Sequence, residues 1–219
     1  MRRRHRDSRQ SNRTILLTGF EPFGGAERNP SQEIARALDG RAIAGRRVVG
    51  AVLPCVFGRA GTELLRLLRK HQSAVVVCLG LAESRAEITP ERVAINVDDA
   101  RIPDNGGQAP ADRPVIRGAP AAYWSTLPVK AMVAALHSRG VPASVSNSAG
   151  TFVCNHVFFR LLHALRRRPG VRGGFVHLPP VMEGGDALAG GPGLPLETMV
   201  EAVAVLLDVA VRDRRRRRA

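Results

Sequence analysis

The stretch AVVVCLG (residues 74–80) decides the fold class of this 219-residue chain. Successive side chains of a β-strand point to opposite faces of its sheet, so a strand with one face in water alternates apolar and polar residues. This stretch shows no alternation, because six apolar residues precede Gly80. A short unbroken apolar run is typical of a central strand in a parallel sheet that helices cover on both faces.

Strand-like and helix-like segments alternate on both sides of this stretch. Short apolar or β-branched runs predict strands, and apolar residues recurring every three or four positions predict helices. Asn29 and Pro30 supply one helix start, an N-cap residue followed by proline at the first helical position. The predicted strands are 14–18, 47–54, 74–80, 92–97, 143–147 and 174–178, and the predicted helices are 30–40, 59–71, 128–139, 152–168 and 196–212. This order predicts an α/β fold, a three-layer α/β/α sandwich around a mostly parallel central sheet. Residues 98–128 read as a long loop, which is usually functional or flexible.

The net charge of +14 is concentrated at the two ends of the chain. Residues 1–13 and residues 212–219 each carry six arginines and one aspartate, which leaves residues 14–211 only mildly basic. Such tails attract polyanions nonspecifically, but runs of like charge are typical of solvated, disordered termini. We predict two basic tails, 1–13 and 212–219, around a single domain at 14–211, with no specific nucleic-acid partner.

The sequence points to a protein of the cytoplasm. No apolar run approaches the roughly 20 residues that a membrane span needs, and no apolar segment of signal-peptide type follows the basic N-terminus. The three cysteines, Cys55, Cys78 and Cys154, are too widely spaced for a disulfide framework or a zinc pattern. They fit a reducing compartment and leave room for one reactive thiol, with no metal site and no membrane contact expected.

Cys154 lies where a predicted strand gives way to a predicted helix, within SNSAGTFVCNHVFF (residues 146–159). Val157, Leu161 and Leu165 follow at intervals of four, so Cys154 falls in or near the first helical turn. Unpaired N–H groups and the positive end of the helix dipole meet there, and they lower the pKa of a thiol. Cys154 is therefore a candidate nucleophile, although its position alone fits a buried small hydrophobe slightly better.

His177 is the candidate base for that thiol. It lies near the carboxyl end of the predicted strand 174–178, and the carboxyl ends of parallel strands share one edge of a sheet. His156, only two residues from Cys154, would point to another face of the helix. The alternative for His177 is a structural histidine at a strand end.

Glu91 is the candidate carboxylate, because an acid beside the base fixes its tautomer and stabilises the imidazolium. The alternative is a surface ion pair with Arg85 or Arg92. Three other carboxylates compete for the role: Asp98, Asp99 and Asp104.

Several stretches resemble the pyrrolidone-carboxyl peptidases, also called type I pyroglutamyl peptidases. They are TGFEPFGGAERNPS (18–31), ITPERVAINVDDARIPDN (88–105), PAAYWSTLP (120–128), SNSAGTFVCNHVFF (146–159) and, in support, GGFVHLPP (173–180). The match extends from about residue 14 to residue 207. It implies a cysteine exopeptidase that removes an N-terminal pyroglutamyl residue from peptides through a thioester, on a three-layer α/β/α fold that is often a homotetramer.

The resemblance also implies roles for single residues. The catalytic cysteine, histidine and glutamate of the family fall on Cys154, His177 and Glu91. Its aromatic pyroglutamyl pocket falls on Phe20 and Phe23. An arginine that stabilises an anion or a carbonyl falls on Arg101. No metal or organic cofactor takes part in this chemistry.

Two departures from the family pattern concern the surroundings of the site: the step before Arg85, and Pro179-Pro180 after His177, where the family often has an aromatic residue. Ala82-Glu83-Ser84-Arg85 replaces a glycine-containing step before the arginine, so Glu83 adds a charge there. The stretch GGDALAGGPG (184–193) reads as a flexible loop without an assigned role. The rival reading of the whole chain is a catalytically weak relative that acts as a binding protein, and no G-x-S-x-G elbow supports a serine hydrolase.

Overall fold

The apolar run 74–80 forms the middle of β4 (Ser73–Leu81), as predicted. In the computed structural model, which describes residues 14–182 and 193–213, β4 lies between two parallel neighbours, β1 (Thr14–Phe20) and β8 (Arg172–Leu178). Together with β3 (Arg46–Leu53), these strands make the parallel centre of a six-stranded sheet of order β2-β3-β1-β4-β8-β5. The short outer strands β2 (Ala42–Ile43) and β5 (Thr89–Pro90) pair antiparallel to their neighbours.

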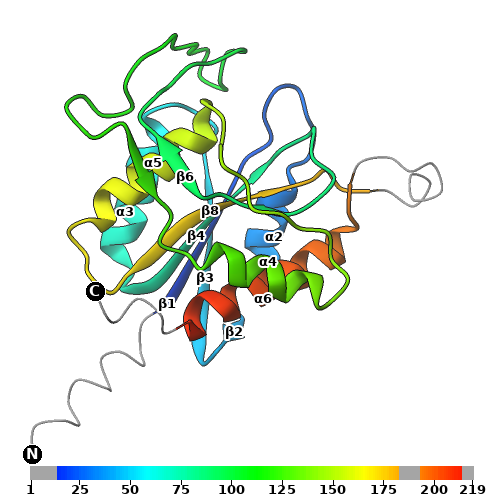
Figure 1. The fold of residues 1–219 in the computed structure, drawn as a ribbon. Helices are drawn as coiled ribbons and strands as arrows, with labels where there is room; N and C mark the ends of the chain where they lie inside the picture. The colour runs from blue at the N-terminus through cyan, green and yellow to red at the C-terminus, as the bar shows by residue number, and fades with distance from the viewer. Residues whose placement is uncertain (1–13, 183–192, 214–219) are drawn as a thin grey trace, which may run out of the picture.

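Helices cover both faces of this sheet (Figure 1). One layer holds α2 (Pro30–Leu38), α4 (Val129–His137) and α6 (Leu196–Arg212), and the other holds α3 (Arg59–Lys70) and α5 (Val153–Leu165). The expected three-layer α/β/α sandwich is therefore confirmed.

Alternate residues of β4 explain why its apolar run is continuous. Val75 and Val77 pack in the layer of α2, α4 and α6, whereas Val76 and Cys78 pack in the layer of α3 and α5. All four are almost completely buried, and full burial of a side chain of valine size stabilises a fold by roughly 1.5–3 kcal/mol. Neither face of this strand can tolerate a polar residue without a partner.

The predicted start of α2 is confirmed. Asn29 has extended backbone angles, its side-chain oxygen accepts from the Ser31 N–H at 3.0 Å, and Pro30 is the first helical residue. Ser31 in turn accepts the backbone N–H of Phe20 through its hydroxyl, at 2.9 Å. A Cβ on Gly19 would lie 2.0 Å from the Ser31 carbonyl oxygen, so only glycine lets the end of β1 approach this helix so closely.

Two expectations about strands need correction. Residues 143–147 form no strand, because only isolated bridges, Ile88 with Ala143 and Glu91 with Ser146, join them to the edge near the two-residue β5. The predicted strand 92–97 exists as β6 (Val93–Ile95), but it belongs to a separate two-stranded sheet with β7 (Ala122–Trp124). The predicted loop 98–128 is therefore irregular except for β7 at its end.

The predicted tails lie largely outside the described residues, as does the predicted loop 184–193 except for Gly193. Arg212, which we assigned to the C-terminal tail, is the last residue of α6 and pairs with Asp208. Within residues 14–182 and 193–213, no helix combines the length and the apolar character needed to cross a membrane.

Candidate active site

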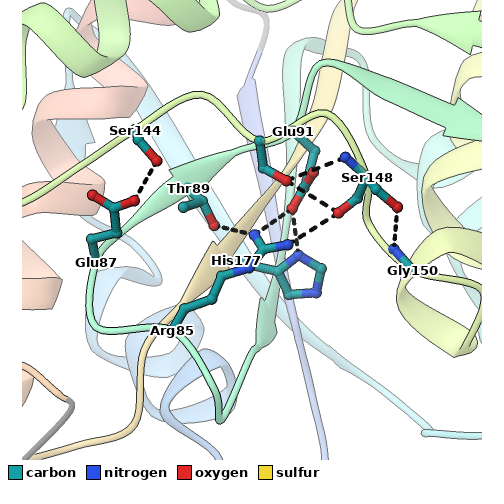
Figure 2. A network of polar contacts seen from close by, with 9 residues as sticks. Arg85, Glu87, Thr89, Glu91, Ser144, Ser148, Gly150 and His177 are labelled. Carbon is teal, nitrogen blue, oxygen red and sulfur yellow. Dashed lines mark hydrogen bonds and ion pairs between the residues drawn. The ribbon is translucent and has the colours of Figure 1, made fainter.

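Glu91 and His177 meet at the carboxyl edge of the sheet, where β5 pairs with the end of β8. Glu91 directly follows β5, and its Oε1 accepts a hydrogen bond from His177 Nδ1 at 2.8 Å (Figure 2). Glu91 is 0% exposed and His177 is 5% exposed. Because Nδ1 donates to the carboxylate, the neutral imidazole carries its proton there and leaves Nε2 as an acceptor.

Cys154 approaches His177 across Gly80 of β4. Gly80 is the register partner of His177 in the parallel pair β4–β8, and neighbouring strands lie about 4.8 Å apart. A Cβ on Gly80 would lie 2.8 Å from Cys154 Sγ, so the thiol rests on this glycine. Side chains of register partners point to the same face of a sheet, and that face is the one α5 covers. The structure therefore brings all three residues, Cys154, His177 and Glu91, to one edge.

The thiol lies at the start of its helix, as expected, but its pKa does not follow the expectation. Cys154 is the second residue of α5. Among the described residues, no side chain caps the N-terminus of this helix with a hydrogen bond. Burial raises the pKa of Cys154 well above the ordinary value of a thiol, Glu91 raises it further, and Arg85 opposes the rise. The prediction of a lowered thiol pKa is thus wrong for the free protein, because desolvation by burial is the largest influence on the pKa of this thiol.

His177 is also shifted toward its neutral form. Burial lowers the pKa of His177, the hydrogen bond to Glu91 raises it, and the positive charge of Arg85 lowers it. A neutral thiol beside a neutral imidazole can react once a proton passes from sulfur to Nε2. The arrangement can therefore perform nucleophilic attack by Cys154 with His177 as general base.

Arg85 binds the same carboxylate oxygen as His177. Its Nη1 donates to Glu91 Oε1 at 2.7 Å and also to the Thr89 hydroxyl, and its Nη2 donates to the Ser148 carbonyl at 3.0 Å (Figure 2). The alternative prediction, a surface ion pair of Glu91 with Arg85, is therefore correct about the partner and wrong about the location. The ion pair exists, but Glu91 is completely buried and not at the surface.

A model of the pyroglutamyl peptidase family matches residues 13–213 of the chain. The chain belongs to this family. The pyrrolidone-carboxylate peptidases of Klebsiella pneumoniae (strain 342) and Cupriavidus taiwanensis are similar to it, with 52% identity over 199 residues and 50% over 203. These alignments cover 91% and 92% of this chain and 93% and 94% of the relatives.

Solved structures of the family share the fold. The crystal structure of pyroglutamyl peptidase I from Bacillus amyloliquefaciens has a TM-score of 0.87 at 41% identity, with 92% of this chain and 98% of that chain covered. A single-residue variant of the pyrrolidone carboxyl peptidase from Pyrococcus furiosus also has a TM-score of 0.87, at 42% identity, with 92% and 99% covered.

The residues expected to form the pyroglutamyl pocket differ in their access to solvent. Phe20 is 2% exposed, and its ring lies 6.4 Å from that of Phe175 inside the core. Phe23 is half-buried, and its ring lies 6.0 Å from that of Phe152, the residue before α5. Phe23 thus packs against the residue that precedes the Cys154 helix, whereas Phe20 lies beneath the surface.

Arg101 is exposed on the long loop that this pyroglutamyl peptidase family member carries after β6. The loop is tied to the segment before α5 by two bonds: the Asp99 N–H donates to the Thr151 carbonyl at 3.0 Å, and the Thr151 hydroxyl donates to the Asp99 carbonyl at 2.7 Å. These bonds hold the backbone beside Arg101 close to the start of the helix that carries Cys154.

The rival carboxylates have other partners. Asp98 accepts from His156 Nδ1 at 2.8 Å, and the His156 ring nitrogen Nε2 accepts the Gly58 N–H at 3.3 Å. Asp104 accepts backbone N–H groups, including that of Phe57 at 2.8 Å. Asp99 is exposed. His156 and Asp98 thus form a separate buried pair that ties α5 to the loops around it.

The sequence did not predict the structural roles of two residues at this edge, Gly80 and Arg85. Gly80 matters because Cys154 rests on it, and a glycine closing an apolar strand is a recognised signal of close backbone approach. Arg85 appeared in the sequence as the arginine of a family motif and as a candidate surface partner of Glu91, but nothing local indicates that its side chain also reaches Ser148. Glu83, which adds a charge to this part of the chain, is exposed in the turn that precedes Arg85.

Proposed function

We propose that this protein is a pyroglutamyl peptidase I, which hydrolyses the bond after an N-terminal pyroglutamyl residue, with Cys154 as nucleophile. One observation carries the proposal: the buried Glu91–His177 pair lies beside Gly80, on which the Cys154 thiol rests. A thiol, an oriented base that can take its proton and a buried acid are the parts that covalent catalysis of this kind requires.

In the first step, Cys154 Sγ attacks the pyroglutamyl carbonyl carbon while His177 Nε2 takes the thiol proton. The resulting oxyanion lies near the N-terminus of α5, where uncapped backbone N–H groups stabilise negative charge. The imidazolium then gives its proton to the leaving amine, the carbon–nitrogen bond breaks, and a thioester remains. Glu91 holds the ring and stabilises its positive charge during this step.

In the second step, water attacks the thioester carbon while His177 Nε2 takes a proton from it. The carbon–sulfur bond breaks, the proton returns to Cys154, and free pyroglutamate leaves. His177 thus acts as base, then acid, in each half of the cycle. No step uses a metal or an organic cofactor.

The pyroglutamyl ring is a lactam without an ammonium group, so its pocket needs apolar area and hydrogen bonds to the lactam N–H and C=O. We assign the apolar contact to Phe23 and Phe20, of which Phe23 is the more accessible, and charge stabilisation at the carbonyl to Arg101. Aromatic rings suit this role because they offer a large rigid surface.

The test is release of a chromogenic amine from a pyroglutamyl amide by the intact protein and by Cys154→Ser. We expect rapid release by the intact protein and a loss of at least about 1,000-fold in the variant. Equal release by the variant would remove Cys154 from its role. Activity restricted to peptides with a free amino terminus would overturn the substrate assignment.

The rival function, a weak relative acting as a binding protein, gains no support from any contact described above. It predicts tight binding of a pyroglutamyl peptide without turnover. The same assay distinguishes this function from the peptidase, because only the peptidase releases the amine. The prediction that the protein forms a homotetramer or another homo-oligomer can be tested by sedimentation at several protein concentrations. The cytoplasm likewise stays a prediction, which cell fractionation tests.

A further inference from the structure

We propose that Arg85 is a positioning residue of this reaction, whose single guanidinium fixes the Glu91 carboxylate relative to the turn that leads into the Cys154 helix. The inference rests on the proposed roles of Cys154, His177 and Glu91. Figure 2 shows the arrangement: the Arg85 side chain reaches between Glu91 on one side and Ser148 on the other.

The first half of this link holds the acid. Arg85 Nη1 and His177 Nδ1 donate to the same oxygen, Glu91 Oε1, at 2.7 and 2.8 Å. Within the described part of the chain, the other oxygen, Oε2, is buried without a hydrogen-bond partner. A carboxylate that is completely buried needs a positive partner, because leaving it unpaired is strongly unfavourable. Arg85 therefore both offsets the charge of Glu91 and limits its rotation.

The second half of the link holds the turn before the nucleophile. The Ser148 carbonyl accepts from Arg85 Nη2 at 3.0 Å and from the Ser146 hydroxyl at 3.1 Å. The Gly150 N–H donates to the Ser148 hydroxyl at 3.2 Å, and Gly150 has a φ of 71°. Hydrogen bonds within the turn thus stabilise its shape, and the Arg85 side chain connects the turn to Glu91. Since α5 starts three residues after Gly150, the bond bears on the position of Cys154.

The backbone around Arg85 is itself anchored to the site. The Arg85 N–H donates to the Ala82 carbonyl at 3.0 Å, which closes a turn directly after β4. At the end of that strand, Gly80 lies against Cys154 Sγ. The segment from Gly80 to Arg85 therefore contacts the thiol, the acid and the turn before the nucleophile. A planar guanidinium can hold two acceptors in fixed directions, which a lysine ammonium cannot do.

Arg85 also affects the base electrostatically. The groups that face His177 are Glu91 from the end of β5, Arg85 from the turn after β4, the Phe175 ring from its own strand and Cys154 from α5. Among the charged ones, Glu91 raises the pKa of His177 and Arg85 lowers it. Loss of the arginine charge should therefore raise the pKa of His177, so that more of the imidazole is already protonated and unable to take the thiol proton.

The experiment compares Arg85→Gln and Arg85→Lys with a matched control, Arg66→Gln. Arg66 forms a comparable two-pronged ion pair with Glu63, at 2.8 and 2.6 Å, on the exposed surface of α3. For Arg85→Gln we expect kcat/KM to fall about 100-fold, the cost of a misplacement of about 1 Å, with the loss in kcat and not in KM. The acid limb of the pH profile should move to higher pH. Arg85→Lys should keep the wild-type limb and recover part of kcat, and Arg66→Gln should match the wild type.

A second measurement does not depend on activity. Titration of the His177 ring by nuclear magnetic resonance in the unliganded protein should give a higher pKa in Arg85→Gln than in the wild type or in Arg85→Lys. An unchanged His177 pKa together with wild-type kcat would overturn the proposal. If Arg85→Gln does not fold, the kcat of Arg85→Lys decides, and a wild-type value there would also overturn it. Absence of pyroglutamyl release by the wild type would instead overturn the proposed function, while the titration would still judge the contact of Arg85 with the Glu91–His177 pair.

Discussion

His177 Nδ1 and Glu91 Oε1 lie 2.8 Å apart, although 86 positions separate the two residues along the chain. The pairing of β5 with the end of β8 brings them together, because Thr89 is the register partner of His177. The bond fixes which ring nitrogen faces Glu91 and which remains for the thiol. This relationship underlies the first two predictions below.

Glu91→Gln should keep the shape of the acid and remove its charge. We expect kcat/KM to fall by up to about 10⁴-fold, the loss that follows when the acid of a serine triad becomes an amide. Because Glu91 raises the pKa of His177, the acid limb of the pH profile should also move to lower pH. The control is Glu87→Gln, a neighbouring carboxylate that accepts from the Ser144 hydroxyl instead. A variant at Glu91 with wild-type kcat/KM would argue against its catalytic role.

The pH profile of the wild type should show activity persisting below the usual range of histidine. Burial lowers the pKa of His177, so the neutral imidazole is retained as the pH falls below the ordinary value of about 6.5. The acid limb of kcat/KM should therefore lie below that value, and activity should be lost only as the pH falls through the lowered pKa. Measurement of kcat/KM between pH 4 and 9 checks this, and a limb above pH 7 would contradict it.

The three thiols should differ in reactivity. Burial raises the pKa of both Cys55 and Cys78 to about 12, and both are buried, whereas Cys154 is half-buried. Iodoacetamide should therefore label Cys154 alone in the folded protein and all three cysteines in urea, as read by mass spectrometry of the peptides. Since burial also raises the pKa of Cys154, its labelling rate should still be climbing with pH above pH 8. A rate that is flat from pH 6 upward would indicate a preformed thiolate.

Gly80→Ala should damage the site through overpacking. The added methyl group would lie 2.8 Å from Cys154 Sγ and 2.8 Å from the Phe175 ring. We expect the free energy of unfolding to fall by about 1–3 kcal/mol and kcat/KM to fall as the thiol is displaced.

The matched control is Gly173→Ala at the opposite end of β8, where the methyl group would meet Leu165 and Leu161. Gly173→Ala should lower the free energy of unfolding by a similar amount, as measured in urea. At temperatures well below its melting temperature it should keep the wild-type kcat/KM. Equal kcat/KM losses in both variants would show that the effect of Gly80→Ala is not local.

Much of the fold could be predicted because its signals are short-range. The apolar run of β4 and the start of α2 at Asn29 depend on residues within a few positions of each other. The strand predictions that were wrong depended instead on long-range contacts. Residues 143–147 look like a strand but find only isolated bridges, and β6 leaves the main sheet to pair with β7, because the choice of partner is made by distant segments.

The sequence by itself determined the types of residue at the carboxyl edge, the layered architecture and the resemblance to the family. The tertiary structure decided what those residues do to one another. It joined Glu91 to both His177 and Arg85, placed Cys154 on Gly80, and raised the pKa of that thiol where its helix position had suggested the reverse. Periodicity and capping act over a few residues, whereas desolvation and charge pairing depend on every atom that packs around a group, and only the complete fold sets that environment.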